Sequence, residues 1–241
     1  MHKISKSLGA LFLALILAAA LCVGCFYGLK FIGNSATGVN PSLSDTNYEN
    51  ITTQKLSEEK MKDAVQLFNN FFVADAEDIN YSYKLSSTVT MPPSITTTGG
   101  TVSSTVIYAR QAGAMISEFR DGVTTYYDLP TQGKYIFNTL ENAWGIVPAP
   151  VMPSDDLLGN IILTAIPNLE LTEDGKAYTL SDFQVQVGTD AIDVETLTVK
   201  FSKKKLVYAS FKSSVATINA TATATYWFFD FGRTEVSLPQ V

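Results

Sequence analysis

Apolar and polar residues alternate with a period of two along most of the chain after residue 80, and this pattern constrains the fold more than any other feature. Between residues 81 and 91, Tyr81, Tyr83 and Leu85 alternate with serine, threonine and lysine. Successive side chains of a β-strand point to opposite faces, so this segment is expected to be a strand with one buried face. The pattern predicts a mainly antiparallel sheet, because antiparallel sheets commonly have one packed and one solvated face.

Similar runs recur along the chain and are separated by turns that contain glycine. We expect roughly eight to eleven strands, the clearest at 101–110, 114–120, 123–129, 134–139, 178–187, 194–202, 206–213 and 218–231. Asp121-Gly122 is the sharpest turn signal, because this pair tolerates the positive φ angles of a two-residue hairpin. The first strands are therefore expected to form consecutive hairpins.

Two segments follow a helical period instead. Residues 57–73 carry apolar side chains at three- and four-residue spacing, including Met61 and Val65, which predicts an amphipathic helix with its apolar stripe in the core. A second helix is expected over 154–166, after a proline-rich loop at 147–153.

The first 32 residues have the organisation of an export signal or membrane anchor. Lys3 and Lys6 precede an uncharged apolar run from Leu8 to Leu29. Such a run matches an export signal, and it is long enough to cross a bilayer as a helix if it is not removed. The lysines favour an N-terminus in the cytoplasm and a large C-terminal part outside it.

Both cysteines lie at the end of this apolar run, so the exported domain has no disulfide. Cys22-Val23-Gly24-Cys25 resembles a bacterial lipobox with Cys25 as the lipidated residue, although Cys22 stands where such motifs usually have an aliphatic residue. Three alternatives stay open: a lipidated Cys25, an uncleaved signal anchor, or cysteines that are simply part of a span. We expect an extracytoplasmic protein anchored to the outer face of the bacterial cytoplasmic membrane by lipidated Cys25 or by the signal anchor.

Composition divides the rest of the chain into a tether and one domain. Residues 33–54 are rich in Gly, Ser, Thr and Asn and are expected to be a flexible tether to a domain over residues 55–241. Removing Lys3, Lys6 and Lys30 from the chain's net charge of −6 leaves −9 for the exported part. An acidic surface repels phosphate backbones, so nucleic acid is not an expected partner.

The exported domain lacks the residues on which most hydrolase mechanisms depend. The sole histidine is His2, so neither a Ser-His-Asp nor a Cys-His arrangement is available, and zinc loses its usual ligands. Paired acids such as Glu173-Asp174 stand where a turn or a helix start accounts for them. Acids at 75, 77 and 78 lack the glycine and distal glutamate of an EF-hand loop. Composition alone leaves a Ser-Lys mechanism open, but we expect no enzyme, no metal and no cofactor.

Two groups of motifs point to a known family. The last strand ends in Phe228-Phe229-Asp230-Phe231-Gly232, followed by Val236-Ser237-Leu238-Pro239; earlier, Asp121-Gly122 leads to Tyr126-Tyr127-Asp128 and Lys134-Tyr135-Ile136-Phe137. With the element order from Leu56 to Pro239, these segments resemble bacterial lipoprotein-carrier-like proteins, the LolA/LolB and LppX/LprG group of extracytoplasmic lipid-binding proteins. The resemblance implies an α+β, mainly β fold, preceded here by the N-terminal signal or anchor helix. In that fold a strongly curved antiparallel sheet, a partial barrel, wraps around a few helices and encloses an apolar cavity.

The same resemblance implies a carrier that binds a lipid or the acyl chain of a lipoprotein, with the membrane and a membrane protein as further partners. The apolar strand faces supply the candidate ligand-lining residues, namely Tyr81, Tyr83, Leu85, Val106, Tyr108, Val199, Phe201, Ala220, Ala222, Ala224, Tyr226 and Phe228. The alanines leave room on their face for a helix or an apolar ligand. The alternative is a structural or regulatory surface module in which the protein's own helices fill the sheet.

Overall fold

The computed structural model describes residues 55–69, 80–93, 100–111, 115–120, 122–128, 131–148, 156–187, 190–215 and 219–241 of the 241-residue chain. The expected signal or anchor with Cys25, the tether and the acidic residues at 75, 77 and 78 lie outside these ranges. None of the described helices is both long enough and apolar enough to span a bilayer.

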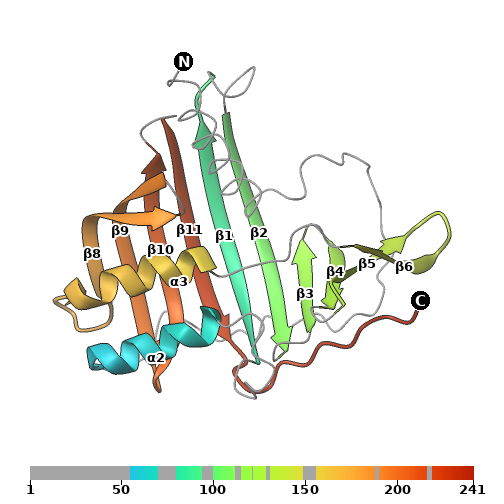
Figure 1. Ribbon diagram of the computed structural model, residues 1–241, viewed down its shortest axis with the longest axis horizontal. Helices are drawn as coiled ribbons and strands as arrows, with labels where there is room; N and C mark the ends of the chain where they lie inside the picture. The colour runs from blue at the N-terminus through green and yellow to red at the C-terminus, as the bar shows by residue number, and fades with distance from the viewer. Residues whose placement is uncertain are drawn as a thin grey trace.

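All described strands belong to one antiparallel sheet of eleven strands that does not close on itself (Figure 1). Its spatial order is β6-β5-β4-β3-β2-β1-β11-β10-β9-β8-β7. The strands are β1 (Tyr81–Met91), β2 (Gly100–Gln111), β3 (Met115–Arg120), β4 (Val123–Asp128), β5 (Gly133–Asn138), β6 (Ala143–Pro148), β7 (Glu170–Leu171), β8 (Tyr178–Val187), β9 (Asp190–Ser202), β10 (Lys205–Val215) and β11 (Ala220–Phe229). The predicted mainly β, antiparallel class is confirmed.

The first and last long strands, β1 and β11, are neighbours in the middle of the sheet. Their register pairs Tyr83 with Phe228 and Leu85 with Tyr226. The chain thus builds one half outward from β1 through β6 and the other from β7 back to β11. Consecutive hairpins on each side account for this order, whereas the central pair joins segments far apart in the sequence.

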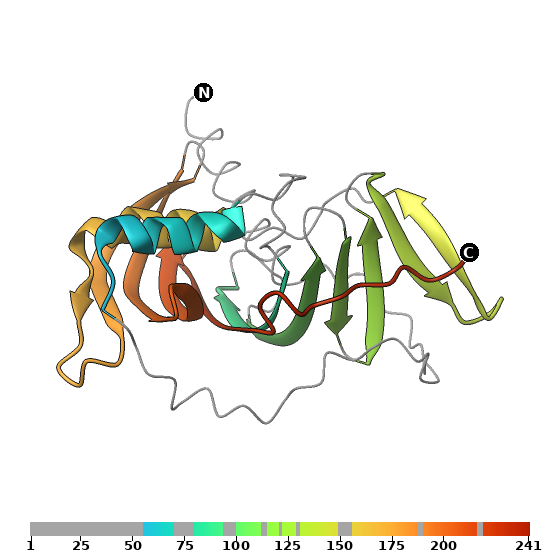
Figure 2. The same ribbon diagram turned by 90° about the horizontal axis from the view of Figure 1, so that it is seen from below.

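Helices α2 (Glu58–Asn69) and α3 (Asp156–Ala165) contact each other, β8 and β10, and so cover one half of the sheet (Figures 1 and 2). We call the face that they cover the inner face and the opposite one the outer face. Ser57 precedes α2, and its carbonyl accepts a hydrogen bond from Met61 N at 3.0 Å. The short helix η2 (Ile166–Asn168), which contains Pro167, follows α3 directly, as the proline predicts.

The main core lies between these helices and the inner face. Val65 of α2, Ile161 and Ile162 of α3, and Leu197 and Phe201 of β9 are each 0% exposed. Burial of side chains of this size contributes about 1.5–3 kcal/mol each. This half of the sheet curves beneath the helices (Figure 2), and register shifts between β9 and β10 accompany the curvature, since such irregularities bend a strand.

The hairpin predicted at Asp121-Gly122 joins β3 to β4. Arg120 and Val123 face each other as the last pair of the two strands, so two residues form the loop. Gly122 has φ +82°, in the left-handed region that glycine adopts without strain.

Two strands depart from the sequence-based expectations. β6 includes Val147 and Pro148, which were expected to begin the proline-rich loop, and β7 has only two residues. β6 shows no alternation between apolar and polar residues, and its side chains are half-buried or exposed throughout. The period-two signal is therefore missing at both ends of the sheet.

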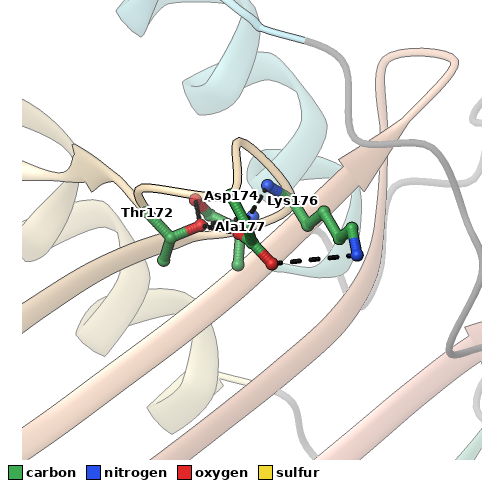
Figure 3. A network of polar contacts seen from close by, with 4 residues as sticks. All are labelled: Thr172, Asp174, Lys176 and Ala177. Atoms are coloured by element: carbon green, nitrogen blue, oxygen red, sulfur yellow. Dashed lines mark hydrogen bonds and ion pairs between the residues drawn. The ribbon is translucent and has the colours of Figure 1, made fainter.

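Hydrogen bonds fix the turn from β7 to β8 (Figure 3). The Thr172 hydroxyl lies 2.7 Å from Asp174 Oδ1, and the same oxygen accepts a bond from Lys176 N at 3.0 Å. These two bonds hold the pKa of the Asp174 carboxyl below its ordinary value, and the bond from the Thr172 hydroxyl has the larger effect. Asp174, one of the paired acids, thus has the structural role in a turn that the sequence predicts for it.

After β11 the chain continues along the outer face toward β6 (Figure 2). Thr234 Oγ1 lies 3.0 Å from Ser82 Oγ of β1, and Val236 N donates to Gln111 Oε1 of β2 at 2.7 Å. Val236 is buried with Ala109 and Tyr126 in a second, smaller cluster. The C-terminal segment therefore spans the junction between the two halves of the sheet.

Candidate functional site

The structure places all the predicted ligand-lining residues on the inner face. Directly paired residues of antiparallel strands share a face, and the register links Tyr83 to Tyr108 and to Phe228. Leu85 is paired in the same way with Val106 and Tyr226. The three alanines and Val199 follow on β11 and β9, and nearly all of these side chains belong to the main core cluster or pack against it.

These residues divide into two groups. Val199 and Phe201 are 0% exposed and belong to the same buried cluster as Val65 of α2 and Ile161 of α3. The second group gathers where β1, β2 and β11 meet, and it belongs to the same buried cluster or packs against it. We call this group the aromatic cluster, and its members are Tyr81, Tyr83, Tyr108, Tyr226 and Phe228.

Ring contacts tie the aromatic cluster together. Tyr83 stacks on Tyr108 with a centroid separation of 4.7 Å and lies 5.6 Å from Phe228. Tyr226 and Phe228 are nearly parallel, 7° apart in plane and 6.0 Å apart in centroid. Offset aromatic contacts in this range stabilise by about 0.5–1.5 kcal/mol beyond the area buried. The result is a continuous group of rings in which Tyr81, Tyr83, Tyr108 and Phe228 are 1–5% exposed and Tyr226 is half-buried.

A buried arginine borders the aromatic cluster. Arg110 is 1% exposed, faces Tyr81 across β1 and β2, and donates from Nη1 to the Tyr81 hydroxyl at 2.7 Å. Its guanidinium carbon also lies 5.6 Å from the Tyr81 ring centroid. A cation over a ring face is attracted by the ring quadrupole, so Tyr81 holds Arg110 in two ways.

Beyond the aromatic cluster, three side chains form what we call the polar group: Glu118, Arg120 and Tyr127. Arg120 Nε lies 3.2 Å from Glu118 Oε1, and the Tyr127 hydroxyl donates to Glu118 Oε2 at 3.1 Å. The register places Glu118 opposite Tyr108 and Arg120 opposite Val106, so the polar group shares the inner face with the aromatic cluster.

Burial shifts the proton affinities of the polar group. The pKa of Tyr127 is raised, first by burial and then by the charge and the hydrogen bond of Glu118. Burial by itself would lower the pKa of Arg120, but the Glu118 carboxylate and the Tyr108 hydroxyl outweigh it and raise that pKa. Tyr127 therefore stays a neutral hydrogen-bond donor, and Arg120 stays a cation, over the pH range in which proteins are folded.

Exposed aliphatic side chains follow the polar group toward β6. Val123 is 46% exposed and faces Arg120, and Val147 is 36% exposed and faces Lys134. Ile136, two residues from Lys134 on the same face, is 39% exposed. The described helices lie over the other half of the sheet, so this end of the inner face carries apolar surface outside their cover (Figures 1 and 2).

Sequence reasoning did not select Arg110, the polar group or Lys134. A charged residue inside an alternating run is usually assigned to the solvated face. The signal that was available is spacing, since Arg110 stands two residues after Tyr108 and a period of two gives both the same face.

Metal chemistry finds no support among the described residues. Within the described ranges, the chain holds no group of three or more His, Cys, Asp or Glu side chains that could bind a metal ion.

No family model and no curated protein matches the sequence. Among solved structures, the chain is similar to a domain from Vibrio parahaemolyticus named for outer membrane lipoprotein sorting, with 9% identity, a TM-score of 0.26, and coverage of 72% of this chain and 94% of the other. It is also similar to a DUF1329 family protein from Desulfovibrio piger, with 9% identity, a TM-score of 0.22, and coverage of 75% and 95%. Both similarities are distant.

Proposed function

We propose that the protein is a carrier that binds a lipid, or the acyl chain of a lipoprotein, on the inner face of its sheet. The observation that supports this most directly is that the aromatic cluster and the exposed Val123, Ile136 and Val147 lie on the same face of the sheet, with the polar group between them. Burial of an acyl chain contributes ~0.8 kcal/mol per methylene. Contact with several methylenes along this surface is therefore enough for binding without any covalent step.

Anchoring to a membrane is the second part of the proposal. The apolar run at 8–29 and the lysines before it support an extracytoplasmic domain that is held at the outer face of the bacterial cytoplasmic membrane. Either lipidated Cys25 or an uncleaved signal anchor would provide the tether. A carrier at this place would exchange its lipid with the membrane or with a membrane protein.

We also propose that the protein is not an enzyme. The inner-face tyrosine with the raised pKa, Tyr127, is a donor to Glu118, and Glu118 is paired with Arg120. These contacts hold the proton-bearing groups in mutual hydrogen bonds and ion pairs. The one histidine, His2, belongs to the targeting segment.

A second candidate function is a surface module that acts by protein contact and encloses nothing. The full burial of Val199 and Phe201 against the helices favours it, because in this half the protein's own side chains fill the inner face. The two candidates differ in what the aromatic cluster contacts in the working protein.

Photochemical labelling in membranes distinguishes them. The full-length chain is produced in bacterial membranes, supplied with a palmitic acid analogue that carries a diazirine in its chain, and irradiated; labelled peptides are identified by mass spectrometry. A carrier gives label on inner-face residues of β1, β2 and β11. Label confined to the first 32 residues, or to the outer face, contradicts the carrier.

Two neighbouring aromatic residues provide a matched pair of variants. Tyr226 lies on the inner face and Trp227, next in the strand, lies on the outer face against Tyr208; both are half-buried. We expect Tyr226→Ser to lower inner-face labelling about tenfold, the effect of losing roughly 1.4 kcal/mol of contact. Trp227→Ser should leave it unchanged, and equal effects of the two variants would contradict a ligand on the inner face.

A further inference from the structure

Charge is distributed unevenly over the inner face at β2 to β5. Among the described residues there, Arg110, Arg120 and Lys134 are cations and Glu118 is the one acid, in a chain whose net charge is −6. The side chain of Arg120 is 12% exposed and that of Glu118 is 15% exposed. This part of the sheet is therefore positively charged, partly desolvated and still in contact with solvent.

The cations are arranged along neighbouring strands. Arg120 on β3 faces Val106 and Val123, while Lys134 on β5 faces Tyr127 and Val147. Lys134 Nζ lies 5.6 Å from the Tyr127 ring centroid, and the Tyr127 hydroxyl in turn binds Glu118. The two cations thus stand on either side of the Glu118–Tyr127 hydrogen bond.

The polar group keeps two charged side chains in a partly buried position. Partly buried ion pairs lose hydration that their mutual attraction repays only in part, so replacement by apolar side chains is often neutral or stabilising. A guanidinium also offers five N–H donors in a planar fork, of which Nε lies 3.2 Å from Glu118 and one bonds the Tyr108 hydroxyl. Planar forks of this kind match carboxylate and phosphate oxygens.

We infer that Arg120 and Lys134 recognise the acidic end of an amphiphile whose chain lies against Val123, Ile136 and Val147. The shared chemistry is a carboxylate or phosphate joined to an acyl chain, from a fatty acid or from an acidic phospholipid. Glu118 and Tyr127 orient Arg120 and are positioning residues. The inference rests on the proposed function and adds the kind of lipid that the carrier selects.

Two probes that differ only at the carboxyl end, one charged and one neutral, test the inference. Membranes containing the full-length chain receive either the diazirine palmitic acid analogue or its methyl ester, at equal concentration, and label is measured on residues 115–148. Charge-assisted hydrogen bonds contribute about 1.5–3 kcal/mol, so we expect at least about tenfold more label from the acid. Equal labelling by acid and ester overturns the inference but leaves the carrier proposal intact, whereas absence of inner-face label from both overturns the carrier proposal.

Variants separate recognition from folding. Arg120→Gln alone leaves Glu118 without its cation, so the decisive change is the double variant Arg120→Gln with Glu118→Gln, which removes both charges. Lys134→Gln, at a less buried position, is the second variant. Both should reduce labelling by the acid severalfold and leave labelling by the ester unchanged, and retention of the acid preference in both overturns the inference.

The control is Lys212→Gln, which removes a cation from the outer face, where Lys212 pairs with Glu195. This variant should leave labelling by both probes unchanged. Competition then identifies the source of the acid: displacement by lysophosphatidic acid indicates a phosphate head group, and displacement by palmitate alone indicates a free fatty acid. Lysophosphatidylcholine carries no net charge and should compete weakly. If it displaces the probe as strongly as the better of the two acidic competitors, recognition of an acidic group is contradicted.

Discussion

Thr172 and Asp174 show at the scale of single residues how a paired acid is used for structure. The carboxylate of Asp174 accepts from the Thr172 hydroxyl and from the Lys176 amide, and the Thr172 hydroxyl accepts from Ala177 N at 3.1 Å (Figure 3). Hydrogen bonds to the charged form lower the pKa of an acid. Their contribution is complete above the ordinary pKa of aspartate and is lost as the pH falls through the lowered value in the folded state.

We expect Thr172→Val to raise the pKa of Asp174 toward the ordinary aspartate value of about 3.9. The variant removes the largest cause of the lowered pKa and keeps the size of the side chain. Carbon-detected NMR titration of the Asp174 carboxyl measures the shift. Thr179→Val, whose hydroxyl donates to Leu197 O at 2.9 Å and not to Asp174, is the control. An unchanged titration in Thr172→Val contradicts this account of the turn.

At the same scale, alternation was enough to place apolar residues and not enough to place charged ones. Once β1 is recognised, the period of two gives Tyr83 and Leu85 the same face, and their burial follows. Arg120 follows the same spacing from Glu118, but two charged residues in a strand favour a solvated face. Only the pairing of β2 with β3 shows that this face is the inner one.

At the scale of elements, local patterns predicted most strands and helices but not the contacts between distant ones. β6 lacks alternation because its residues are exposed or half-buried on both faces, and it is a strand because β5 supplies hydrogen-bonding partners. The pairing of β1 with β11 has no local signature either. Helix α2 was predicted from its period, whereas its attachment to β8 was not.

One hydroxyl group links the residue before α2 to β8. Leu56 N, just before the helix, donates to the Tyr178 hydroxyl of β8 at 3.0 Å in a buried position. Tyr178→Phe removes the acceptor, which costs about 1–3 kcal/mol for a buried donor. We expect hydrogen exchange of the amides at 56–65 to become at least about fivefold faster, measured by mass spectrometry.

Tyr208→Phe on the outer face provides the control for this prediction, because Tyr208 lies against Trp227 and Lys200 and far in sequence from α2. Exchange at 56–65 should not respond to it. If both variants speed exchange equally, the loss is a general loosening of the sheet and not the release of α2.

At the scale of the whole molecule, the two halves of the sheet have different means of stabilisation. The half from β8 to β11 packs against α2 and α3, and the largest fully buried residues of β9, including Phe201, lie there. The half from β2 to β6 is stabilised instead from the outer face, by the C-terminal segment on Ala109, Tyr126 and Trp144. The described helices do not cover the inner face of that half, where we propose that the acidic amphiphile binds.

Destabilising the C-terminal segment should therefore loosen one half of the sheet selectively. Val236 is 4% exposed, and Val236→Asp replaces a packed side chain by a carboxylate, which we expect to cost about 2–4 kcal/mol. Amides of β3 and β4 should exchange faster, while those of β9 and β10, which are held by the helices, keep their protection. Ser237→Asp, at the exposed neighbouring position, introduces the same charge and should change neither half. Uniformly faster exchange in Val236→Asp would show that the sheet unfolds as one unit, because a segment that supported only β2 to β6 could not transmit its loss to strands packed against α2 and α3.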